Sequence, residues 1–191
     1  NRFKGLPQCE WMEELVTNLE DKFKIKGSTK SVISMESNAY AEGLKYLSII
    51  FNAIINKQVL HIVYTPFNKP DCIWDIHPYY IKQYNNRWFL LALNEEQQVI
   101  TNIPLDRIAE CSPINLKYKP TEIDFNEYFD DVIGVTIPRN AEVEKILLKF
   151  SQQRFSYVTS KPLHWSQKIK DKENCIIEIS VIPNKELYSL L

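Results

Sequence analysis

The feature that most constrains the fold is a change in the spacing of apolar residues near position 57. Before it, apolar residues recur every three or four positions, first from Trp11 to Phe23 and again over residues 40–56. This spacing places them on one face of a helix, so we predict two helices. After position 57 the repeat shortens to two, which is the repeat of β-strands. The chain is therefore predicted to begin as helices and to continue as a sheet.

The sheet region is predicted from short apolar runs separated by turns. Asn85-Asn86 predicts a tight hairpin turn because Asn tolerates positive φ. The run before it is extended and aromatic, and we expect Pro78 to break it. The run after it, residues 87–93, is apolar on both faces and indicates a strand that is covered on both sides. Five strands at hairpin spacing predict a small antiparallel barrel. The runs are residues 59–64, 73–84, 87–93, 99–103 and 109–116.

The remaining chain divides by charge and pattern. Residues 120–133 hold five acidic residues and no basic ones, and are predicted to be a connector with a short helix. Beyond them the order strand, helix, strand, strand, helix is most of a ferredoxin-like unit. We predict these last elements at residues 144–150, 152–160, 163–170 and 175–183, then a helix that begins near Asn184. The predicted division is linker helices 1–56, barrel 57–118, connector 119–133 and a C-terminal extension 134–191.

Composition excludes several function classes. The 23 Lys and Arg nearly balance the 24 Asp and Glu, so no global field favours nucleic acid or membrane, and any nucleic-acid contact needs a local basic patch. The four glycines never cluster, which excludes the glycine-rich loops that bind phosphates. No signal segment and no apolar stretch of about 20 residues is present, so we expect a soluble, cytoplasmic protein without membrane contact. The chain lacks an initial Met and ends inside an apparent helix, which suggests a piece of a longer protein.

The sequence offers little catalytic or metal-binding chemistry. The three histidines and four cysteines have no metal-ligand spacing, and the cysteines are expected to be reduced thiols. We therefore predict no metal, no cofactor and no enzyme activity. A hydrolase that pairs Cys111 or Cys72 with a histidine such as His77 stays open as an alternative. The paired carboxylates Glu95-Glu96 and Asp130-Asp131 are most simply solvated charges.

Aromatic and basic residues are dense in the predicted barrel. Aromatic faces next to cations stack and clamp nucleobases or other flat anions, although many of these aromatics are needed to fill a small core. Lys82 and Arg87 flank the hairpin turn. Arg107 has two interpretations, as a ligand contact or as the partner of Asp106 or another nearby carboxylate. We expect the cations to converge on one exposed aromatic surface that includes Trp88.

Three short motifs resemble the WYL-domain transcriptional regulators. They are residues 77–81 (HPYYI), residues 87–90 (RWFL) with Phe in place of the family's Tyr, and residues 105–108 (LDRI). The flanking helices resemble the linker helices of that family, and residues 134–191 resemble its C-terminal extension. One departure is Trp74, which stands where many members have an Arg, and this favours base stacking over phosphate binding.

The resemblance implies a fold and a function. The fold is α+β, with linker helices, a five-stranded Sm/SH3-like barrel and a partial ferredoxin-like extension. The function is the effector-sensing and dimerisation part of a bacterial regulator, which reads operator DNA through an N-terminal winged helix-turn-helix that is not identifiable here. The barrel binds a nucleic-acid-derived or other anionic effector. The implied ligand residues are Tyr64, His77, Tyr79, Lys82, Arg87, Trp88 and Arg107.

A second class of function remains open from the same residues. The barrel and extension could serve only to hold subunits together, as a protein–protein interaction module without a small ligand. Apolar helix faces left exposed on the two early helices would favour this alternative.

Overall fold

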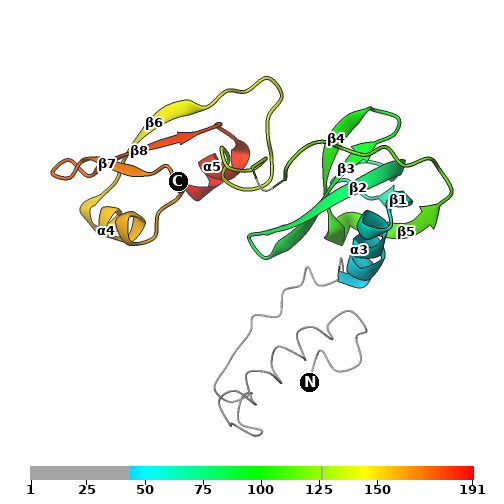
Figure 1. Ribbon diagram of the computed structural model, residues 1–191. Coiled ribbons are helices and arrows are strands. Elements are labelled where there is room, and N and C mark those ends of the chain that lie inside the picture. Colours follow the sequence, from blue (N-terminus) through cyan, green and yellow to red (C-terminus); the bar gives the residue numbers. More distant parts are fainter. Residues whose placement is uncertain (1–43, 126) are drawn as a thin grey trace, which may run out of the picture. The chain divides into compact units, whose positions relative to one another are not determined.

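The structure is a computed structural model that describes residues 44–125 and 127–191. It divides into two compact units, and the chain passes from one to the other between Pro120 and Thr121. The first unit holds a five-stranded antiparallel sheet and the second a three-stranded sheet, each accompanied by helix (Figure 1). The predicted α+β class is confirmed. The helix predicted from Trp11 to Phe23 lies outside the described residues.

The first unit contains the five predicted strands in the order β4-β3-β2-β1-β5. Every neighbouring pair is antiparallel, and among the described residues no pairing joins β4 to β5, so the sheet is not closed. Both Asn85 and Asn86 have positive φ, as the predicted turn requires. The elements are α3 (Leu47–Ile55), β1 (Val59–Tyr64), β2 (Cys72–Tyr84), β3 (Arg87–Asn94), β4 (Val99–Pro104), the 3₁₀ turn η2 (Leu105–Arg107) and β5 (Ile108–Ile114).

Strand β2 corrects the expectation that Pro78 breaks the extended run. The strand is continuous, but its register against β3 shifts between Pro78 and Tyr80, so that Tyr79 is an extra residue. Proline lacks the N–H that a regular ladder needs, and an irregularity of this kind is where a strand tolerates it. The bulge therefore keeps Pro78 within the strand.

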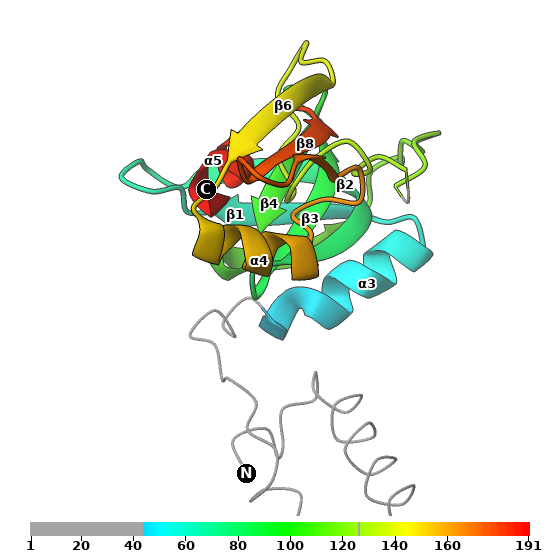
Figure 2. The same ribbon diagram turned by 90° about the vertical axis from the view of Figure 1, so that its left-hand side faces the viewer.

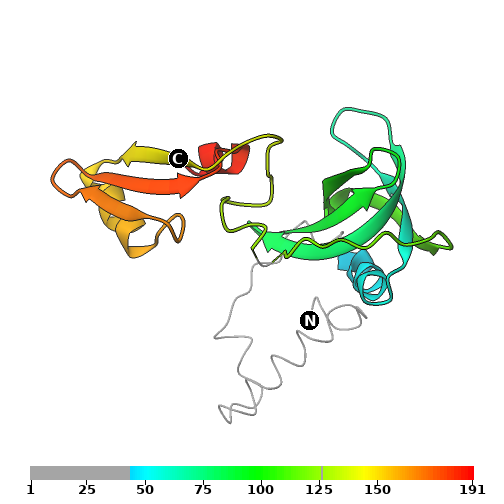
Figure 3. The ribbon, with the colours of Figure 1, turned by 45° about the horizontal axis from the view of Figure 1, so that its top comes forward.

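Helix α3 covers one face of the five-stranded sheet (Figures 2 and 3). Its Ile50 and Ala53 are buried with Leu60, Ile76 and Leu90, which come from three different strands. Cross-strand pairing explains this set, because Leu60 pairs with Ile76 and alternate residues of a strand share a face. This face is the hydrophobic core of the first unit.

The second unit contains a sheet in the order β6-β8-β7, with β8 antiparallel to both neighbours. Ile177, Ile179 and Val181 of β8 are fully buried. Phe155 and Val158 of the helix between β6 and β7 are also buried. The elements are β6 (Glu144–Lys149), α4 (Gln152–Ser160), β7 (Lys168–Asp171), β8 (Ile176–Val181) and α5 (Lys185–Leu190).

One predicted strand of this unit is shorter than expected, and one predicted helix is wrong. The strand expected at residues 163–170 begins only at Lys168, because the Gln167 side chain bonds to the backbone of Leu163 and Val158 and holds the segment as a loop. The short helix expected in the connector is not formed by the described residues there, which make isolated turns. In the part of the chain with described structure, no helix is long and apolar enough to cross a membrane.

Candidate ligand site of the five-stranded sheet

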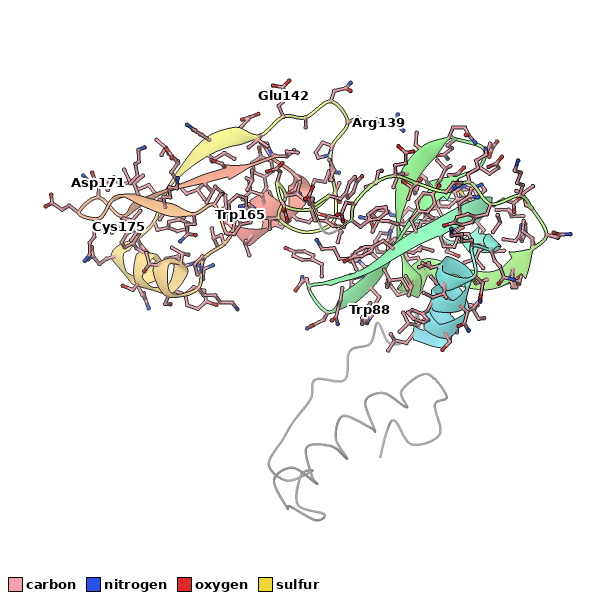
Figure 4. The ribbon with its side chains drawn as sticks, viewed as in Figure 1. Trp88, Arg139, Glu142, Trp165, Asp171 and Cys175 are labelled. Atoms are coloured by element: carbon pink, nitrogen blue, oxygen red, sulfur yellow. The ribbon has the colours of Figure 1, made fainter. Side chains whose placement is uncertain are left out.

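The two faces of the sheet separate the predicted site residues. Strand pairing places Gln83 opposite Trp88 and Lys82 opposite Phe89, so Arg87 and Trp88 point to opposite faces of β3. Trp88 is half-buried against the core beneath the hairpin (Figure 4). Arg87 and Lys82 lie on the other face. The expected single surface that joins these cations to the Trp88 indole is therefore not what the structure shows.

Arg87 forms an ion pair with Asp106. Its Nη2 donates to both carboxylate oxygens, at 3.0 Å to Oδ1 and 2.8 Å to Oδ2. The two side chains are only 24% and 15% exposed, so the charges neutralise each other in a partly desolvated place. Sequence reasoning offered Asp106 as a partner for its neighbour Arg107. The structure assigns it to Arg87 instead, because β3 and η2 pack side by side.

Arg107 lies beside an aromatic ring and the end of β1. Its guanidinium carbon is 3.4 Å from the centroid of the Phe67 ring, and its backbone oxygen accepts from Thr65 N at 2.9 Å. The Nε of Arg107 is buried and has no hydrogen-bond partner among the described residues. A buried donor of this kind costs free energy unless water or a ligand satisfies it. Arg107 thus has a buried donor that a water or a ligand could satisfy.

Tyr64 stacks on Trp74 next to this arginine. The ring centroids are 4.7 Å apart with 19° between the planes, and both rings pack partly against the core. Tyr64 precedes Thr65, whose N–H bonds to the backbone oxygen of Arg107, so the end of β1 lies next to the backbone of η2. We call Arg87, Asp106, Arg107 and Phe67 the arginine cluster; the Tyr64–Trp74 pair adjoins it.

His77 belongs to a different neighbourhood. Its side chain is fully buried on β2, its Nε2 is 2.6 Å from Glu95 Oε2, and its Nδ1 accepts from Lys119 N at 3.0 Å. Because Nδ1 accepts, the proton of the neutral ring resides on Nε2 and is donated to Glu95. Both ring nitrogens are bonded within the protein, and so His77 offers neither one to a ligand.

The residues around His77 fasten the end of the first unit to β2. Tyr79 Oη donates to Lys119 O at 2.8 Å, and Tyr118 Oη donates to Pro78 O at 2.8 Å. Lys119 Nζ donates to Glu95 Oε1 at 2.9 Å. We call residues 117–120 the strap. His77 and Tyr79, both predicted to bind the ligand, instead hold the strap.

Ionisation in this region follows from the same contacts. Hydrogen bonds from Lys119 and His77 lower the pKa of Glu95, which stays a carboxylate. Burial raises the pKa of Tyr118 to about 12, with a smaller contribution from Tyr79. Burial also raises the pKa of Tyr79. The strap is therefore attached through one carboxylate, that of Glu95, and through the protonated hydroxyls of Tyr79 and Tyr118.

A cavity of about 200 Å³ opens on the sheet between the two neighbourhoods. It is lined by His61, Ile73, Trp74, Asp75, Glu95 and Glu96. His61 Nδ1 is 2.6 Å from Asp75 Oδ1. Three carboxylates in the lining make this cavity unsuitable for an anionic ligand, because like charges repel at short range. An anion is better accommodated at the arginine cluster.

Sequence reasoning missed several residues that organise this region. Glu95 is not simply a solvated charge, because it bonds to both His77 and Lys119. Tyr118 and Lys119 were not singled out, and their partners lie about forty positions earlier in the chain. No local pattern predicts such a contact. Phe67, in contrast, was among the dense aromatics noted in the sequence.

The cysteine alternative gains no support from the site. Burial raises the pKa of Cys111 to about 11, which leaves the thiol protonated and weakly nucleophilic near neutral pH. Within residues 44–125 and 127–191, no three His, Cys, Asp or Glu side chains are grouped as metal ligands.

Comparison with known families identifies the first unit. The family model of the WYL domain matches residues 45–113, which span α3 and all five strands. These elements form a small α+β domain, in which one helix covers an antiparallel sheet. Residues 45–113 are a WYL domain.

Two further comparisons were made. Proteasome accessory factor B/C (PafBC) of Arthrobacter aurescens is a solved structure that is similar at a TM-score of 0.40 and 14% identity. The similarity covers 82% of this chain and 24% of the other, so the chain spans about a quarter of that protein's length. At this score the likeness carries no argument about function. No curated protein sequence matches the chain.

Proposed function

We propose that this chain is the effector-sensing part of a bacterial transcriptional regulator and that its WYL domain binds an anionic, nucleic-acid-derived ligand at the arginine cluster. The WYL match supports a regulatory sensing domain in general. The observation that carries the ligand proposal is Arg107, whose guanidinium packs on Phe67 while its Nε remains buried and unbonded. A ligand oxygen or a water would satisfy such a donor.

Neighbouring residues supply the remaining chemistry of the proposed site. The stacked Tyr64–Trp74 pair, at the end of β1 where Thr65 bonds to the Arg107 backbone, would offer an aromatic surface suited to a base. Arg87 is held by Asp106, so its role is to fix η2 and thereby place Arg107. In this proposal His77 and Tyr79 are structural, Trp88 supports the site from the core, and Lys82 contributes charge on the outer face.

Binding would act by linkage. A ligand that prefers one arrangement of the regulator shifts the population of its DNA-binding part toward or away from operator-competent states.

We also propose that the five-stranded sheet is an Sm/SH3-like barrel. Its support is the long strand β2, which pairs with β1 through its first half and with β3 through its second, and bends at the Tyr79 bulge. The β8-centred sheet of the second unit supports a ferredoxin-like extension.

The test is fluorescence anisotropy of the chain with short single-stranded DNA at several salt concentrations. Wild-type binding should weaken steeply with salt, and Arg107→Ala should reduce the slope of log K against log salt by about 0.7. Arg139→Ala is the matched control, since Arg139 is an exposed arginine of the second unit (Figure 4). Equal slopes for wild type and Arg107→Ala would remove Arg107 from the site, and absence of binding at low salt would reject a nucleic-acid ligand.

A second candidate function rests on α3. Phe51 and Ile55, four positions apart on this helix, are 57% and 65% exposed in the described structure. Residues at that spacing form one apolar surface, which suits association with another protein subunit. We propose homodimerisation as this alternative role. Light scattering should show a dimer that Phe51→Ser dissociates; a monomeric wild type would reject this candidate.

A further inference from the structure

We propose that His77 is a pH-sensitive fastening of the strap, whose hydrogen bond from Lys119 N exists only while the imidazole is neutral. The strap leads directly into the second unit at Thr121. Its attachment therefore determines whether the last residues of the first unit are fixed or free. This inference goes beyond the ligand proposal and does not depend on it.

The geometry requires a neutral ring. Lys119 N donates to His77 Nδ1, so a proton added at Nδ1 would place two hydrogens between these atoms. The ring cannot rotate to avoid this without breaking its bond from Nε2 to Glu95. Its side chain is fully buried, so water does not compensate for the loss. Protonation of His77 is thus incompatible with the bond from Lys119 N, whereas the bonds made by Tyr79, Tyr118 and Lys119 Nζ do not involve the imidazole.

The charged and titratable groups around His77 come from every element that contacts it. Glu95 comes from the turn after β3, Lys119 and Tyr118 from the strap, and Tyr79 from β2 itself. Glu95 attracts a proton to the ring, while the Lys119 ammonium at 2.8 Å from Glu95 offsets that attraction. The two tyrosines are uncharged at neutral pH, and burial raises their pKa values further above the ordinary 10.0.

The order of protonation gives the switch its direction. Histidine is the side chain that ordinarily changes charge between about pH 5 and 8. Hydrogen bonds from Lys119 and His77 lower the pKa of Glu95, so this group stays a carboxylate and remains an acceptor for the ring. The strap is consequently held most firmly by the neutral ring and loses its bond from Lys119 N when His77 is protonated. The protonated ring retains Glu95 as its partner.

The experiment is a nuclear magnetic resonance titration of the whole chain from pH 8 to pH 5, with three reporters. The His77 ring nitrogens report its protonation, the Lys119 amide reports the strap, and the Leu90 amide reports the core. We expect the Lys119 amide to shift with the same midpoint as His77. Its hydrogen exchange, corrected for intrinsic pH dependence, should accelerate by about fivefold or more, the factor that one lost hydrogen bond implies. The Leu90 amide should not change.

Two variants complete the test. His77→Gln cannot be protonated and should abolish the pH dependence of the Lys119 amide. His61→Gln is the matched control, because His61 also contacts a carboxylate at 2.6 Å but has no bond to the strap, and it should titrate like wild type. A His77 ring that stays neutral down to pH 5, a Lys119 amide that ignores His77 protonation, or one that moves only together with Leu90, would overturn the proposal. If His77→Gln does not fold, these wild-type reporters still decide.

Discussion

The arginine cluster and the strap are built from similar residues but use them differently. Where the strap is attached, His77 of β2 is fully buried, and its two ring nitrogens bond to Glu95 and to Lys119 of the strap. In the arginine cluster, Arg87 Nη2 bonds to Asp106, but the buried Nε atoms of Arg87 and Arg107 have no hydrogen-bond partner among the described residues, and Arg107 also rests on the exposed ring of Phe67. The difference teaches that a satisfied polar network points to structure, and an unsatisfied one beside an aromatic surface points to a ligand.

The largest effect is expected from removal of the buried histidine. His77→Ala should lower the free energy of unfolding by about 2–4 kcal/mol, because it leaves a cavity and orphans the Lys119 N–H. His61→Ala removes a half-exposed histidine and should cost less than about 1 kcal/mol. Urea unfolding, followed by the fluorescence of Trp74 and Trp88 in a background without Trp11 and Trp165, measures both. Equal losses would contradict the distinction between a buried and an exposed histidine.

The next effect concerns the ion pair of the arginine cluster. Arg87→Ala should cost about 1–3 kcal/mol, because it leaves the Asp106 carboxylate partly buried and without the guanidinium. The double variant Arg87→Ala/Asp106→Ala should recover part of that loss, since no carboxylate then remains without its partner. A double-mutant cycle by the same unfolding measurement checks this. Strict additivity would show that the pair does not stabilise η2.

A smaller effect is expected from Tyr118 and appears only in alkali. Its pKa is raised from 10.0 to about 12 by burial, so the folded state disfavours the ionised ring. Stability from this group is complete below pH 10 and declines as the pH rises from 10 toward 12. Tyr118→Phe should show a flatter decline over that range, measured by thermal unfolding at each pH. Parallel curves for the two proteins would contradict the role of Tyr118 burial.

The smallest effect is expected from Phe67. Its ring is 73% exposed, so Phe67→Ala should lower stability by less than about 1 kcal/mol, the usual value of an exposed cation–π contact. If Arg107 serves a ligand, the same change should weaken binding of single-stranded DNA more than it weakens the fold. Comparison of the anisotropy and unfolding results separates the two effects. A stability loss as large as that of Arg87→Ala would indicate a purely structural Arg107–Phe67 pair.

Much of the fold could be predicted from the sequence because its signals are local. Alternation over residues 59–64 matches β1, and the spacing of residues 152–160 matches α4 at both ends. The two asparagines before Arg87 adopt the positive φ that their residue type allows. Pro78 misled the prediction because a bulge, visible only in the pairing of β2 with β3, accommodates it.

The candidate site was only partly predictable, and the reason is sequence distance. The identities of Arg87, Arg107 and the nearby aromatic residues marked a region rich in cations and rings. Which carboxylate each cation contacts was decided by packing of β3 against η2, across nineteen positions between Arg87 and Asp106. Likewise, the 42 positions between His77 and Lys119 carry no pattern that would foretell their hydrogen bond.

The sequence by itself determined the local elements, because the period of apolar residues and the conformational range of single residues act over a few positions. Tertiary structure alone decided which polar groups are matched. Burial makes an unmatched group costly, and burial is a property of the whole fold rather than of any segment. For that reason the histidine of the HPYYI motif holds the strap, and the arginine of the LDRI motif keeps a buried donor that a ligand could satisfy.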